Sequence, residues 1–91
     1  SDLELLSQPE DVTVASGETA VITVDAVGED MTYTWYYRNA GASGFTRTDT
    51  FTGDTYSLKM TSARSGRQVY CVVTDGSGNT VATDVVTLYI A

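Results

Sequence analysis

The chain has 91 residues, a formal net charge of -7 at pH 7 and a hydrophobic fraction of 42%. A chain of this length buries only about 60–65% of its unfolded surface, which predicts one modest core and a single domain over residues 1–91, with residues 1–8 as a linker or a first strand. Twelve acidic side chains against five basic ones, which do not cluster along the sequence, argue against nucleic-acid binding, and no apolar run approaches the roughly 20 residues that span a bilayer.

The N-terminal third predicts two strands. Val12 and Val14 belong to a first strand, and Pro9 before them predicts that this strand switches sheets, because proline is tolerated at strand edges and breaks. Residues 20–26 then alternate, so that apolar side chains share one face and polar ones mostly the other. This pattern predicts a strand with one buried face.

The middle of the chain continues the alternation. Tyr33, Trp35 and Tyr37 lie on one side of the next predicted strand, and a loop of small residues follows at positions 39–44. Residues 45–50 are polar and short, which predicts an edge strand.

Three further segments complete the predicted sheets. Residues 56–60 place Tyr56, Leu58 and Met60 inward, and residues 69–73 place Val69, Cys71 and Val73 inward. Residues 75–79 have the composition of a hairpin turn, and a last strand carries Val86, Leu88 and Ile90. About seven short strands with turns every 8–12 residues or so are typical of a sandwich or barrel, and no segment predicts a helix.

Two landmarks have the order and spacing of an immunoglobulin domain. Residues 17–24 resemble its second strand, with Val24 where the first disulfide cysteine stands, and Trp35 resembles the core tryptophan of its third strand. Cys71 occupies the place of the second cysteine. The segments 56–61 and 63–75 resemble a repeat found in tandem immunoglobulin-like arrays of Gram-positive bacterial surface proteins, and the resemblance covers residues 8 to 90.

The resemblance implies an all-β, immunoglobulin-like β-sandwich of about seven strands with Greek-key connections and no disulfide. Because Cys71 is the only cysteine, packing alone must hold the two sheets together. The expected structural core consists of Val24, Trp35, Leu58, Cys71 and Val73.

We expect no catalytic residue, no cofactor and no enzyme activity. The chain has no histidine, which removes the commonest general base and zinc ligand. Cys71 shares a face with Val69 and Val73 and has no base beside it, so a buried thiol is favoured over a nucleophile. Lys59 is the only lysine and should face water, which argues against the Lys–Asn isopeptide bond of some similar bacterial modules.

We also expect no metal site. Asp75, Ser77 and Asn79 alternate as calcium ligands can, but the run lacks a bidentate glutamate, and a hairpin turn explains its composition. The adjacent carboxylates at positions 10–11 and 29–30 fall in predicted turns, which favours a solvated surface over acid–base chemistry.

Strict alternation also predicts an outward face on the third, sixth and seventh strands. Tyrosine beside arginine is typical of interface hot spots, but tyrosine and β-branched residues also stabilise exposed sheets through cross-strand pairs. Both interpretations remain open. The candidate interaction face comprises Tyr36, Arg38, Tyr70, Val72, Val85 and Tyr89.

The leading functional hypothesis is a structural spacer, one module of a stalk on a secreted or cell-surface bacterial protein, whose export signal would lie outside these residues. A strand of ten residues spans roughly 33 Å, which predicts the length added per copy. The alternative is an adhesion or carbohydrate- or protein-binding module that uses the outer aromatic face, and a domain of a phage particle is a further possibility, because fold alone does not decide function. The expected partners are neighbouring domains of the same chain and a protein or glycan ligand.

Overall fold

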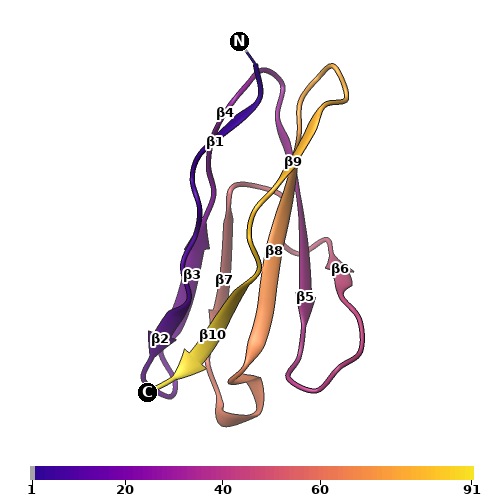
Figure 1. Cartoon of the computed structure of the whole chain (residues 1–91). Helices are drawn as coiled ribbons and strands as arrows, with labels where there is room; N and C mark the ends of the chain where they lie inside the picture. Colours follow the sequence, from indigo (N-terminus) through magenta and orange to yellow (C-terminus); the bar gives the residue numbers. More distant parts are fainter. Residues whose placement is uncertain (1) are drawn as a thin grey trace.

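Ten short strands and one 3-10 helix make up the part of the chain that the computed structural model describes, residues 2–91 (Figure 1). The elements are β1 (Glu4–Ser7), β2 (Val12–Val14), β3 (Thr19–Thr23), β4 (Asp25–Val27), β5 (Thr32–Arg38), β6 (Thr46–Thr48), β7 (Thr55–Lys59), η1 (Ser62–Arg64), β8 (Arg67–Thr74), β9 (Thr80–Ala82) and β10 (Val86–Ile90). The helix η1 was not expected. No helix in residues 2–91 is long and apolar enough to cross a membrane.

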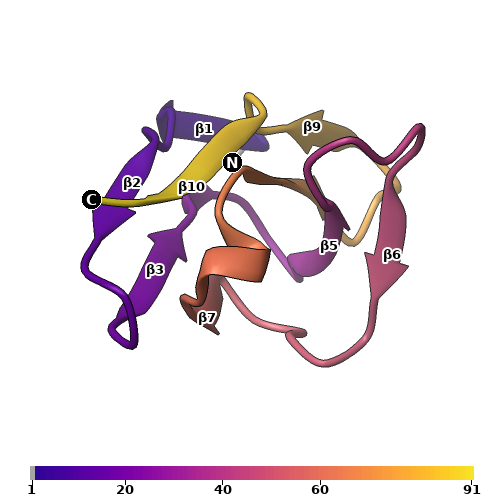
Figure 2. The ribbon, with the colours of Figure 1, turned by 90° about the horizontal axis from the view of Figure 1, so that it is seen from below.

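The strands form two layers around a common core (Figure 2). The larger layer has the order β2-β10-β8-β5-β6, and β9 also pairs with β8. Strand β10 runs parallel to β2, whereas the other pairs in this layer are antiparallel. The smaller layer contains the antiparallel pairs β1–β4 and β3–β7.

Three interruptions turn seven strands into ten. The first strand changes layers between β1 and β2, at Pro9, as the sequence predicted. The second breaks at Val24, between β3 and β4, and the last breaks between β9 and β10. The chain crosses between the layers from β2 to β3, from β4 to β5, from β6 to β7 and from β7 to β8, so sequence neighbours are often not sheet neighbours.

Alternation predicted the core well. Trp35 of β5 lies opposite Cys71 of β8, and both are buried. Leu58 is only half-buried and packs against the edge of the core, because β7 has a strand neighbour on one side alone. The buried hydrophobic core consists of Ala20, Ile22, Val24, Trp35, Tyr56, Met60, Val69, Cys71, Val73, Val86 and Leu88.

Thr83 explains the break in the last strand. Its backbone N–H donates to the carbonyl oxygen of Cys71 at 2.9 Å, and its hydroxyl oxygen accepts the N–H of Cys71 at 3.0 Å. Thr83 is the one buried polar residue in the described part of the chain. Its side chain therefore takes the place of a strand partner, and the backbone hydrogen bonds of β8 remain satisfied across the gap.

Candidate interaction face

The outer surface of β5 and β8 carries a stacked pair of tyrosines. Tyr36 and Tyr70 lie directly opposite each other in the antiparallel register, and their ring centroids are 4.8 Å apart at an interplanar angle of 11°. Both side chains are half-buried. They point outward because their neighbours Trp35 and Cys71 point into the core.

Three further side chains continue from this pair in a row of contacts. Phe45, just before β6, meets the ring of Tyr70 edge-on at 4.9 Å, and the guanidinium of Arg38 lies 4.5 Å from the centre of the Phe45 ring. The Nε of Arg38 donates to Oε1 of Gln68 at 2.9 Å, and Nη2 of Arg38 also contacts this oxygen. We call Tyr36, Arg38, Phe45, Gln68 and Tyr70 the aromatic cluster.

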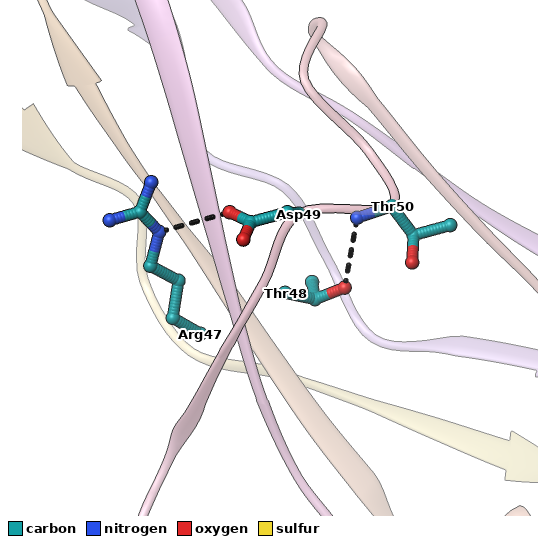
Figure 3. A network of polar contacts seen from close by, with 4 residues as sticks. All are labelled: Arg47, Thr48, Asp49 and Thr50. Carbon is teal, nitrogen blue, oxygen red and sulfur yellow. Dashed lines mark hydrogen bonds and ion pairs between the residues drawn. The ribbon is translucent and has the colours of Figure 1, made fainter.

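The edge strand beside the cluster is polar. Arg47 of β6 is in register with Tyr36, and its Nε donates to Oδ1 of Asp49 at 3.2 Å (Figure 3). The N–H of Thr50 donates to the hydroxyl oxygen of Thr48 at 3.3 Å (Figure 3). A short edge with charged side chains discourages pairing with another strand, which favours the face of the sheet over this edge as a contact surface.

The six predicted face residues lie on β5, β8, β10 and the break before β10. Tyr36, Arg38 and Tyr70 meet in the aromatic cluster, and Val72 is half-buried on β8 opposite Ala82 of β9. Val85 is 44% exposed in the break before β10. Tyr89 is 43% exposed and lies opposite Thr13 of β2, where β10 pairs with β2 and no longer with β8.

Sequence reasoning missed Phe45 and Gln68. Phe45 was assigned only to a polar edge strand, and Gln68 has the same phase as Tyr70 along β8. The sequence signal for Phe45 was its position directly after the loop at 39–44. The chain turns back in this loop, which brings the residue that follows it beside the end of β5. Strand alternation could not place Phe45, because it lies outside the strand.

The turn at 75–79 is organised by its own carboxylate. Oδ1 of Asp75 accepts the N–H groups of Ser77 at 3.0 Å and Asn79 at 2.9 Å, and Oδ2 accepts Nδ2 of Asn79 at 3.1 Å. The side-chain hydrogen bond from Asn79, together with the backbone donors, lowers the pKa of Asp75. The carboxylate is thus engaged in the hairpin, and residues 2–91 contain no cluster of three or more metal-ligating acids or thiols.

Cys71 is completely buried, and burial raises its pKa to about 12 against the smaller lowering effect of a backbone hydrogen bond from Thr34. A neutral thiol is a poor nucleophile.

A small pocket of about 250 Å³ lies at the end of the molecule near the N-terminus and is lined by Asp2, Leu3, Asn79, Thr80 and Val81. Its lining contains one carboxylate, that of Asp2.

No known family model matches the chain, and no curated protein matches its sequence. Solved structures do match. The first two immunoglobulin domains of DIP-gamma superpose with a TM-score of 0.67 at 19% identity, covering 97% of this chain and 47% of that one. A titin–obscurin-like 1 Ig complex gives 0.64 at 17% identity over 98% and 93% of the two chains. An I-band fragment of titin gives 0.65 at 18% identity over 97% and 32%.

These similarities establish the fold class as an immunoglobulin-like β-sandwich, which confirms the prediction from the sequence. The chain spans about half the length of the DIP-gamma chain, 47%, and nearly the whole length of the chain from the titin complex, 93%. At these identities the resemblance concerns the fold alone.

Proposed function

We propose that the chain is a non-catalytic immunoglobulin-like module that acts as a spacer in a tandem array of a secreted or cell-surface bacterial protein. The observation that carries the proposal is the position of the two chain ends (Figure 1). Asp2 and Leu3 lie beside Asn79 at one pole, whereas Ala91 donates its N–H to the carbonyl of Val14 at the opposite pole. Copies joined in sequence therefore extend the molecule along its long axis.

The dimensions suit this role. The long axis measures 41 Å against 23 and 19 Å across, so an end-to-end junction adds far more length than a side-by-side arrangement. The observed length exceeds the roughly 33 Å expected from a ten-residue strand, because the turns at both poles project beyond the sheets. The resemblance to bacterial tandem repeats supports the assignment to a cell surface.

A protein with two copies joined from Ala91 to Ser1 tests the proposal. Small-angle X-ray scattering should show a maximum dimension greater than that of one copy by about the 41 Å long axis. An increase closer to the 23 Å width would mean that the copies fold back against each other, and the spacer function would then be wrong.

A second candidate is a binding module that uses the aromatic cluster. It is favoured by the Tyr36–Tyr70 stack, because rings already ordered by stacking lose little freedom when a protein or glycan ligand binds. Glycan and protein binding screens with Tyr36→Ser and Tyr70→Ser test it. Loss of binding at a temperature at which both variants remain folded supports a ligand site, whereas loss of stability with no binding by the parent chain shows that the cluster only reinforces the sheet.

A further inference from the structure

Acidic and basic side chains are concentrated at opposite ends of the long axis of the molecule. At the pole near the N-terminus, the backbone N–H of Gly76 donates to the carbonyl of Glu29 at 3.0 Å, and the side chain of Asp30 lies directly beside Gly76. Segments 2–5, 27–33 and 73–81 meet here and contain no lysine or arginine. We call this end the acidic pole, and its carboxylates are Asp2, Glu4, Glu29, Asp30 and Asp75.

Most of the basic side chains lie at the opposite end. Nη1 of Arg64 donates to the carbonyl of Lys59 at 2.8 Å, and Nε of Arg67 donates to Oδ1 of Asn39 at 2.9 Å, which brings the β7–β8 connection beside the end of β5. Glu18, in the turn between β2 and β3, is the acidic residue at this end. We call this end the basic pole, and its cations are Arg38, Lys59, Arg64 and Arg67.

The arginines of the basic pole are held by neutral groups. Arg67 donates to the Tyr56 hydroxyl at 3.0 Å as well as to Asn39, and its guanidinium lies 4.6 Å from the centre of the Tyr37 ring. Arg38 is held by Gln68. Within residues 2–91 the only ion pair between side chains is Arg47–Asp49, on the edge strand β6, where Arg47 is in register with Tyr36. The three arginines are thus held by hydrogen bonds without being neutralised, although acidic residues outnumber basic ones more than twofold in the chain.

We infer that this separation of charge docks copies of the chain head to tail, with the basic pole of one copy against the acidic pole of the next. The inference rests on the proposed spacer function, because in an array each basic pole is followed by an acidic pole. Opposite charges at such a junction lie within the Debye length of about 8–10 Å at physiological salt, so they attract. The partner is therefore a second copy of this chain, and the docking stiffens the array.

The test uses the two-copy protein in solution. The amide chemical shifts of Gly76 in the second copy and Gly66 in the first, compared with those of the single chain, report the docked fraction. We expect docking at about 20 mM salt and its loss at about 500 mM salt, because screening weakens exposed ion pairs. Arg64→Glu in the first copy should lower the ratio of docked to undocked molecules by about 1.5- to 5-fold for each ion pair lost.

Arg47→Glu in the first copy is the matched control, since it makes the same charge change at the edge strand and should leave the docked fraction unchanged. Lys59→Glu is a second variant, because the Lys59 side chain is exposed and its substitution spares the core even if Arg64→Glu affects folding. Asp2→Lys in the second copy should restore docking to either variant of the first.

The possible results distinguish a failure of the docking from a failure of the spacer function. A scattering profile that stays extended, with amide shifts that respond neither to salt nor to the pole variants, would overturn the docking and leave the spacer intact. A profile that is folded back would overturn the spacer and the docking together. An equal response to Arg47→Glu and Arg64→Glu would show a dependence on net charge alone, which also contradicts docking of the poles.

Discussion

At the scale of single residues, Cys71 lies in the centre of the core with no measurable exposure. The thiolate is the reactive form, and burial holds the thiol in its neutral state. We therefore expect a thiol reagent at about pH 8 to modify Cys71 slowly in the folded protein and rapidly in denaturant, as followed by absorbance or mass spectrometry. Equal rates in the two states would contradict the burial of the thiol.

The same burial makes stability depend on pH in the alkaline range. The pKa of Cys71 rises from 9.0 to about 12, so its contribution to the free energy of unfolding is complete below pH 9 and is lost as the pH rises toward 12. Urea denaturation of the parent chain and of Cys71→Ala at a series of pH values measures this contribution. The two curves should converge above pH 9. Burial also raises the pKa of Tyr33, so both curves should fall in the alkaline range.

Thr83 is a second residue whose side chain has a defined structural role, because its hydroxyl accepts a backbone hydrogen bond. Thr83→Val keeps the shape but removes the oxygen that accepts the N–H of Cys71, so a buried donor loses its partner. We expect a loss of about 1–3 kcal/mol in the free energy of unfolding, measured by urea denaturation. Thr80→Val, on exposed β9, is the control and should change stability little. A cost for Thr83→Val no larger than that of the control would show that the hydroxyl is dispensable.

At the scale of elements, two side chains extend the pairing of the N-terminal segment with the last strand. Oδ1 of Asp11 accepts the N–H of Thr87 at 2.8 Å, and Oε1 of Gln8 accepts the N–H of Asp84 at 2.8 Å. Asp11→Ala should accelerate hydrogen exchange at the Thr87 amide and lower stability by about 0.5–1.5 kcal/mol, the value of one hydrogen bond. Asp11→Asn retains an acceptor and should preserve slow exchange at Thr87. Unchanged exchange in Asp11→Ala would mean that this bond does not anchor β2.

The aromatic cluster couples β5, β8 and the start of β6. Tyr70 contacts both Tyr36 and Phe45, whereas no other ring contacts Tyr36 in the described structure. Tyr70→Ser should therefore destabilise the protein more than Tyr36→Ser, and a double-mutant cycle should give a coupling of about 0.5–1.5 kcal/mol. Additive effects of the two substitutions would show that the stacked geometry contributes nothing beyond burial.

At the scale of the whole molecule, pairing joins the two ends of the chain. Strand β2 pairs with β10, and the hydrogen bond between Asp11 and Thr87 links residues 76 positions apart. Contacts so distant in sequence require a large loss of chain entropy before they form. We expect folding on the timescale of roughly milliseconds to seconds, measured by stopped-flow fluorescence of Trp35. Folding in microseconds would indicate that local contacts dominate the transition state.

Alternation located most of the core because it depends only on neighbouring residues. The inward positions Trp35, Cys71 and Val73 follow from the period of two along each strand, and Pro9 marks the change of layer because proline cannot donate a hydrogen bond to a sheet. The half-burial of Leu58 did not follow from alternation, because it depends on β7 having one strand neighbour instead of two.

The candidate face could also be predicted only in part, because alternation does not say which strands become neighbours. Tyr36 and Tyr70 follow from alternation together with the pairing of β5 with β8. Phe45 reaches them from a loop, and Tyr89 separates from them because β10 leaves β8 and pairs with β2. The position of Phe45 depends on loop geometry, and the position of Tyr89 depends on which strands become neighbours.

The amino-acid sequence by itself determined the class of fold, the inward face of the strands at 20–26, 33–37, 56–60, 69–73 and 86–90, and the absence of histidine, because these depend on residue types and on a local period. Only the tertiary structure decided that Thr83 bridges the broken last strand, that Phe45 closes the aromatic cluster and that charge separates toward the two poles. Residues from segments far apart in the chain create each of these features. Their proximity is set by the crossings between layers, which no local pattern encodes.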